Sequence, residues 1–180
     1  MTNYIALLRG INVGGKNIIR MADLKTCFEG LGFGKVTTFI QSGNVLFATS
    51  GKTPEKLVTT IERALDKTFN YKSTVLVRSA SDIAGVLTDV PRDWKTRTDL
   101  RCYVAFVKPP VTVAEVIREI PVKAGIDTIS AGKGAVYMTT VLSGLTKSGL
   151  NKIIGKNIYR LITIRNYSTM KKIAALMNND

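Results

Sequence analysis

Apolar positions along the first half of the chain alternate with period two over short stretches and recur at helical spacing between them. Strands are expected over four ranges: 4–9, 35–41, 45–49 and 73–78. The first expected helix has one apolar face, made of Met21, Leu24, Cys27, Phe28 and Leu31. The second runs over 54–69, with Thr53 as its cap and Pro54 at its first position. The order is that of a split β-α-β, or ferredoxin-like, unit.

The second half repeats this order less clearly. A short helix over 82–87 and a connector over 89–99, with Trp94 as its hydrophobic anchor, lead into it. Strands are then expected over 101–107, 127–130, 135–141 and 159–164, and helices after the capping box Thr112–Glu115, near 150–154, and from Asn166 or Ser168 onward. The pattern predicts an α+β protein of two tandem ferredoxin-like units with antiparallel sheets and a C-terminal helix. The expected units are residues 1–90 and 91–180, which can also pack as one compact domain.

Composition places the chain among ordinary globular proteins. Of its 180 residues 45% are hydrophobic and 22% charged. No apolar run approaches the roughly 20 residues that span a bilayer. Residues 1–10 lack the pattern of a secretory signal, and the two cysteines have no companions at metal-ligand spacing. We therefore expect a cytoplasmic protein that has no membrane contact, no metal and no cofactor.

Histidine is absent from the sequence, which narrows the chemistry that the chain can perform. Acid–base catalysis near neutral pH would need a lysine, cysteine, tyrosine or carboxyl group with a shifted pKa. The thirteen acidic residues are scattered, without a pair at the spacing of metal ligands, so a two-metal nuclease is not expected. Whether the protein is an enzyme stays open at this point.

Positive charge is the strongest bias in the sequence. Twenty-six lysines and arginines oppose thirteen acids, which gives a net charge of +13. No acid stands between Asp127 and Asp180, whereas eight cations do: Lys133, Lys147, Lys152, Lys156, Arg160, Arg165, Lys171 and Lys172. Such a segment attracts nucleic acid or phosphorylated ligands. The alternative is that it serves only solubility.

A glycine-rich stretch, Gly10 to Asn17, follows the first strand. Its spacing imitates a phosphate-binding P-loop, but Asn17 stands where a magnesium-binding Ser or Thr belongs, and the helix starts several residues too late. A looser anion nest of Gly14, Gly15 and Lys16 is the more plausible interpretation, since successive amides in glycine-rich turns bind anions. The alternative is a tight loop with a solvated lysine.

Ferredoxin-like topology places the end of the first strand beside the start of the third. This predicts a cluster without acids, in which these residues meet: Arg9, Asn12, Gly14, Gly15, Lys16, Asn17, Gln41, Ser42, Gly43 and Asn44. The cluster could hold a carboxylate, a phosphate or a sugar-phosphate backbone. The alternative is that its polar groups satisfy the loop main chain. A third candidate is the start of the last helix, where Arg165, Asn166 and Thr169 coincide with an anion-attracting helix end.

Several of these motifs together resemble the bacterial family known as domain of unknown function 1697. The resemblance rests on ALLRGINVGGKN, Met21 with Leu24, Leu31-Gly32-Phe33, QSGNV, and RN followed by Thr169. It implies two tandem ferredoxin-like units and no established activity. The family usually has tryptophan where this chain has Tyr167.

Three hypotheses for the function remain. The first is an anion-binding protein that contacts nucleic acid through its basic surface. The second is a site for a phosphorylated or carboxylated small metabolite beside the glycine-rich loop, and the third is a protein-interaction module. The paired aromatics of ribonucleoprotein domains are missing from the strands, which weakens the first hypothesis without removing it.

Overall fold

The computed structural model describes residues 1–15 and 17–178, and the chain falls into two compact units. The first unit contains Met1–Asp82 and the last helical turn from Ala175. The second contains Ile83–Ala174. The division between residues 90 and 91 stays a prediction.

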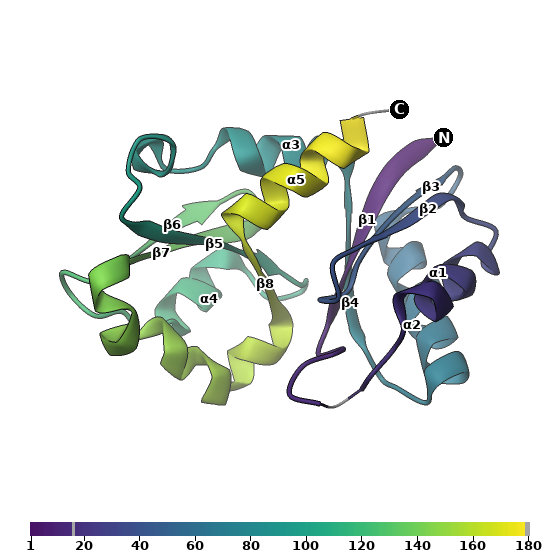
Figure 1. Ribbon diagram of the computed structural model, residues 1–180, viewed down its shortest axis with the longest axis horizontal. Helices are drawn as coiled ribbons and strands as arrows, with labels where there is room; N and C mark the ends of the chain where they lie inside the picture. Colours follow the sequence, from purple (N-terminus) through teal and green to yellow (C-terminus); the bar gives the residue numbers. More distant parts are fainter. Residues whose placement is uncertain (16, 179–180) are drawn as a thin grey trace. The chain divides into compact units, whose positions relative to one another are not determined.

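The first unit has the ferredoxin-like order that the sequence predicts. Its elements are β1 (Thr2–Arg9), α1 (Met21–Glu29), β2 (Gly34–Phe39), β3 (Asn44–Thr49), α2 (Pro54–Phe69) and β4 (Thr74–Ser79). The strands form one antiparallel sheet in the order β2-β3-β1-β4. Both helices cover the same face of this sheet (Figure 1).

The core of the first unit follows from the two periodicities of its sequence. Every second residue of β1 and β3, such as Leu8 and Phe47, points to the helices, and α2 brings Leu57, Ile61 and Leu65 to the sheet at helical spacing. All five side chains are buried. The strong apolar stripe of α2 therefore fixes which face of the helix meets the sheet.

The second unit has a sheet of the same connectivity. Its elements are the end of α3 (Ala80–Thr88), η1 (Arg92–Lys95), β5 (Leu100–Val107), α4 (Val113–Glu119), β6 (Asp127–Gly132), β7 (Ala135–Val141), the 3₁₀ helices η2 (Leu142–Lys147), η3 (Leu150–Gly155) and η4 (Asn157–Leu161), β8 (Ile162–Asn166) and most of α5 (Tyr167–Asn178). The strand order is β6-β7-β5-β8, all antiparallel. Two ferredoxin-like units in tandem are thus confirmed.

The connection from β7 to β8 differs from the prediction. The helix expected near 150–154 is the 3₁₀ helix η3, and the strand expected over 159–164 begins only at Ile162 because η4 includes residues 157–161. Glycines explain the difference. Gly149 packs so tightly that a Cβ there would lie 2.9 Å from the Pro121 carbonyl oxygen, and Gly144 and Gly155 interrupt the segment further.

Trp94 is the hydrophobic anchor that the sequence predicts for the connector. Its indole Nε1 donates a hydrogen bond of 2.8 Å to Thr139 Oγ1, and its ring meets that of Tyr137 edge-on at 5.6 Å. The Tyr137 hydroxyl in turn donates to the carbonyl of Val86 at 2.8 Å. The connector is therefore fixed to the face of the second sheet opposite α4.

No helix in the parts of the chain that the structure describes has the length and apolar character needed to cross a membrane.

Candidate functional site

The loop after β1 is shaped by a series of left-handed residues. Positive φ angles occur at Gly10 (77°), Asn12 (54°), Gly14 (61°), Gly15 (72°) and Asn17 (51°). Glycine and asparagine are the residues that adopt this conformation most easily, so the composition of the loop matches its backbone. Lys16 lies outside the described residues, and its predicted part in an anion nest stays a prediction.

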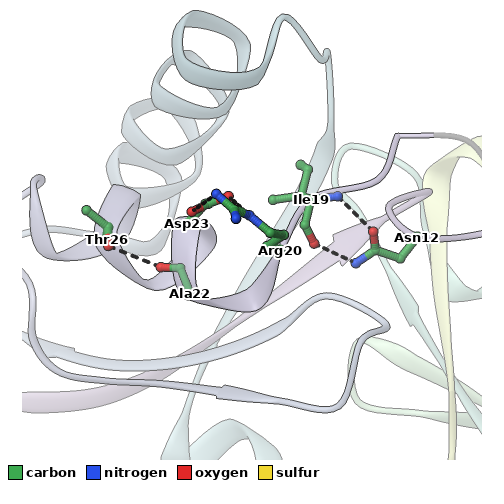
Figure 2. Close-up of polar contacts among 6 residues, drawn as sticks. All are labelled: Asn12, Ile19, Arg20, Ala22, Asp23 and Thr26. Carbon is green, nitrogen blue, oxygen red and sulfur yellow. Dashed lines mark hydrogen bonds and ion pairs between the residues drawn. The ribbon is translucent and has the colours of Figure 1, made fainter.

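Asn12 holds the two ends of this loop with its side-chain amide. Its Oδ1 accepts from the amide of Ile19 at 2.8 Å, and its Nδ2 donates to the carbonyls of Ile19 and Gln41, both at 3.0 Å. Figure 2 shows the two hydrogen bonds between Asn12 and Ile19. It also shows the bidentate ion pair between Arg20 and Asp23, with N–O distances of 2.7 and 3.2 Å. The bond to Gln41 joins the loop to the bend between β2 and β3.

The loop and the bend therefore meet, as the strand pairing predicts. Leu7 is opposite Asn44 in the β1–β3 register, and the amide of Leu8 donates to the carbonyl of Gly43 at 2.7 Å. Asn44 is fully buried and donates through Nδ2 to the carbonyl of Phe39 at 3.1 Å and to Ser42 Oγ at 3.0 Å. The contact between the loop and the bend is therefore made mainly by hydrogen bonds within the protein.

The amide groups of this cluster are largely committed to main chain. Asn17 Nδ2 donates to the carbonyl of Gly10 at 3.0 Å, as the amides of Asn12 and Asn44 do to other carbonyls. Arg9 and Ser42 are half-buried, and Gly14 and Gly15 are exposed. Donors that hold a loop together are less available to a ligand, which favours a structural role for the three asparagines.

Substitution of Gly43 tests how closely the bend packs against β1. A Cβ at this position would lie 2.9 Å from Leu8 Cβ, and the residue has φ +77°. We expect Gly43→Ala to lower the free energy of unfolding by about 2 kcal/mol, because the backbone strain of alanine at a positive φ adds to the steric overlap of its Cβ with Leu8. The matched control is Gly51→Ala, where φ is +73° but a Cβ would meet nothing within 4 Å. Equal losses in urea unfolding of both variants would contradict the steric argument.

A second candidate site is a basic pocket in the second unit. It has a volume of about 430 Å³ and is lined by Trp94, Arg97, Leu100, Arg101, Cys102, Asn166, Tyr167, Ser168 and Lys171. These residues come from η1, the segment after it, β5, the last residue of β8 and the start of α5. We call this the basic pocket.

Charge in the basic pocket comes from three cations and two nearby acids, Asp99 and Asp93, and the charge of Asp93 acts on both Arg97 and Cys102. Arg97 is paired with Asp99, through Nε–Oδ1 at 3.0 Å and Nη2–Oδ2 at 2.6 Å. Lys171 Nζ lies 4.9 Å from the centre of the Tyr167 ring, which packs at 5.0 Å against Trp94. The first turn of α5 contributes the positive end of its dipole. Three cations against two acids therefore leave the pocket with a net positive charge.

Cys102 lines the pocket, and its environment makes its thiol unreactive. Burial, with a smaller contribution from Asp93, raises the pKa of its thiol to about 11. At neutral pH the group is a thiol rather than the reactive thiolate. Covalent chemistry through Cys102 is therefore disfavoured.

The residues predicted near the last helix fall partly into this pocket. Asn166 lines it, and Arg165 and Thr169 are not among its lining residues. Arg165 Nη1 donates to the carbonyl of Ile164 at 3.0 Å, and burial lowers the pKa of its guanidinium to about 10. Arg97, Arg101 and Lys171 could not be predicted as a group from the sequence, because only the β5–β8 pairing and the packing of Trp94 bring them together.

No group of three or more side chains able to hold a metal ion occurs within residues 1–15 and 17–178.

Comparison with known proteins identifies a family and similar solved structures. Residues 1–137 match a family described as "Protein of unknown function (DUF1697)". The structure of the conserved bacterial protein SP0830 from Streptococcus pneumoniae is similar, with a TM-score of 0.86 and 29% sequence identity over 98% of this chain and 99% of that chain. No curated protein sequence matches the chain significantly. The matches agree on the fold and bring no activity with them.

Proposed function

We propose that this chain, which belongs to the DUF1697 family as its motifs predict, binds nucleic acid through the basic pocket and the cations around it. The observation that carries the proposal is the lining of the pocket, where Arg101, Lys171 and the first turn of α5 converge. Phosphate groups are the anions that such donors bind best in proteins. Contacts to phosphate position a nucleic acid without reading its sequence.

The exposed surface of the second unit supports a polyanion rather than a single small anion. Five further cations of its acid-free segment are exposed: Lys133, Lys147, Lys152, Arg160 and Lys172. Lys156 is also exposed and pairs with Glu119 at 3.1 Å. Several separate cations neutralise several phosphates, and each contact releases counterions into solution. A steep dependence of affinity on salt is the expected signature.

The test is fluorescence anisotropy with labelled single-stranded and duplex oligonucleotides over a series of salt concentrations. The slope of log K against log salt should be steeper than −2, at about −0.7 to −0.9 for each phosphate contact. A flat salt response would rule the proposal out.

Lys171→Gln and Arg101→Gln are the variants that address the pocket itself. Each is expected to weaken oligonucleotide binding about three- to tenfold and to make the salt slope shallower by about one contact. The matched control is Lys67→Gln, an exposed lysine on α2 of the first unit that lies outside both the pocket lining and the acid-free segment. If this control weakens binding as much as Lys171→Gln does, the pocket has no special part in the contact.

A phosphorylated or carboxylated metabolite beside the glycine-rich loop stays the alternative. Gly14 and Gly15 favour it, because both are exposed and left-handed, a geometry that can present successive amides to an anion. Competition distinguishes the two functions. Inorganic phosphate or a nucleoside monophosphate at millimolar concentration should displace the oligonucleotide only weakly if many phosphates contribute to its binding.

A further inference from the structure

The connection between β7 and β8 leaves a hollow in the second unit at a place where the first unit has a helix. In the first unit the corresponding connection contains α2, whose Leu57, Ile61 and Leu65 pack on the sheet. The second unit has three short 3₁₀ helices instead, η2 to η4. These bring fewer apolar side chains to the sheet, and a cavity of about 220 Å³ remains.

This cavity is lined mainly by apolar side chains. The lining consists of Tyr103, Met138, Thr140, Leu145, Ser148, Leu150, Asn151, Ile153, Ile154, Tyr159 and Ile164. Six of the eleven are aliphatic or methionine and two are tyrosines. Ligand sites in proteins have this composition, an apolar wall with a few polar groups at defined points.

Three polar side chains of the cavity lining already have hydrogen-bond partners within the protein. Thr140 Oγ1 and Ser148 Oγ both donate to Asp127 Oδ1, at 2.8 and 2.7 Å, and Ser148 Oγ accepts from the amide of Leu150 at 3.1 Å. Asn151 Nδ2 donates to the carbonyl of Leu145 at 3.2 Å. The hydroxyl hydrogens of Thr140 and Ser148 are therefore not available to a polar ligand. This part of the wall is suited to an apolar group.

The same 3₁₀ helices carry positive charge on their outer side. Lys147 precedes Ser148 in the sequence, Lys152 lies between Asn151 and Ile153, and Arg160 follows Tyr159; all three cations are exposed. Each cation is thus next in sequence to a residue of the cavity lining. Asp127 lies behind the inner wall, where it accepts hydrogen bonds from Thr140 and Ser148, and no further acid occurs before Asp180, so the exposed charge of residues 142–161 is positive.

We propose that this cavity binds a small monocarboxylate with an aromatic body, the ring in the cavity and the carboxylate beside Lys147, Lys152 and Arg160. The volume fits a ring of this kind, because benzene enters an apolar protein cavity of about 150 Å³. The apolar wall contributes through burial of the ring, and the cations contribute through attraction of the carboxylate. This site is separate from the basic pocket, and the two have no lining residue in common.

The test uses benzoate as the probe and benzyl alcohol as its uncharged counterpart, with affinities measured by calorimetry on the full chain. Benzoate should bind at one site, about fivefold or more tightly than benzyl alcohol. Leu145→Trp places a large side chain in the cavity and should weaken benzoate binding about tenfold or more. The matched control is Leu142→Trp, on the same 3₁₀ helix but outside the lining, which should leave it unchanged.

A second pair of variants tests the charge. The double variant Lys147→Gln with Lys152→Gln should weaken benzoate binding about fivefold and leave benzyl alcohol unaffected. Lys133→Gln with Lys172→Gln removes the same charge elsewhere in the second unit and should change benzoate affinity less than twofold.

If Leu145→Trp does not fold, as judged by its circular dichroism, Ile154→Trp replaces it, because Ile154 lines the cavity and is 65% exposed.

Three results would overturn the proposal: no saturable benzoate binding, equal binding of benzyl alcohol, or benzoate affinity that cavity-filling substitutions do not change. Oligonucleotide binding by Leu145→Trp separates this site from the proposed function. Loss of benzoate binding with normal oligonucleotide binding is the expected pair. Failure of oligonucleotide binding in the unmodified protein leaves the benzoate experiment unaffected.

Discussion

Replacing Asp127 with alanine should lower the free energy of unfolding by about 4 kcal/mol, the largest effect expected of any single substitution proposed for this protein. The carboxylate is buried and accepts four hydrogen bonds. Thr140 Oγ1 and Ser148 Oγ donate to Oδ1 at 2.8 and 2.7 Å. The amides of Lys123 and Gly149 donate to Oδ2 at 2.9 and 2.7 Å.

These four donors come from separate parts of the second unit. Thr140 lies in β7, Ser148 and Gly149 lie between η2 and η3, and Lys123 precedes β6. Removing the carboxylate leaves buried donors without an acceptor, and each costs about 1 kcal/mol or more. Asp127 therefore holds together a segment that has no long helix to organise it.

The same carboxylate makes the stability depend on pH. Burial alone would raise the pKa of Asp127, but the hydrogen bonds from Ser148, Lys123, Thr140 and Gly149 together lower it below its ordinary value of 3.8. Because the folded-state pKa is the lower one, the stabilisation is fully present above about pH 4 and is lost as the pH falls through the folded-state pKa. Asp127→Asn cannot titrate and should lose less stability than the unmodified protein in this acid range.

The fluorescence of Trp94 can measure both the loss of stability in Asp127→Ala and the pH dependence of stability. It is the single tryptophan, and it is buried in the second unit. Urea unfolding followed by its fluorescence thus reports on the unit that contains Asp127. The control is Asp89→Asn, an exposed acid of the same unit, which should change stability by less than about 0.5 kcal/mol. A difference between Asp127→Asn and the unmodified protein that stays constant from pH 7 to pH 2 would refute the assignment.

Asn12→Ala should have the second largest effect, a loss of about 3 kcal/mol of stability in the first unit. The substitution removes three hydrogen bonds, to the main chain of Ile19 and to the carbonyl of Gln41. It also places alanine at a φ of +54°, which costs about 1 kcal/mol. Hydrogen exchange of the β1 and β3 amides provides the measurement, because Trp94 lies in the other unit.

Two comparisons separate the causes of this loss. Asn12→Gly removes the same bonds but adopts the left-handed conformation easily, so it should cost about 2 kcal/mol. Asn70→Ala changes an exposed asparagine with a φ of +49° at the end of α2, and it should cost only the conformational term of about 1 kcal/mol. An Asn12→Ala variant as stable as the unmodified protein would show that this amide is available for a ligand after all.

The helices and strands of the first unit could be predicted because local pattern and tertiary environment agree there. The stripe of Leu57, Ile61 and Leu65 and the cap at Thr53 specify α2, and alternating apolar residues specify β1 and β3. The meeting of the glycine-rich loop with the bend at Gly43 also followed from the sequence, since antiparallel pairing of the first and third strands requires it. What the asparagine amides bind there did not follow, because the same group can face a ligand or a carbonyl.

By itself the sequence determined the order of the elements, the two ferredoxin-like sheets, the family and the excess of positive charge, because each is a property of local periodicity, of a motif or of a sum over residues. Tertiary structure alone decided that Arg97, Arg101 and Lys171 line one pocket, that Asp127 organises the connection after β7, and that a cavity remains there. These features depend on contacts between residues far apart in the chain, and such contacts leave no periodic trace in a single sequence.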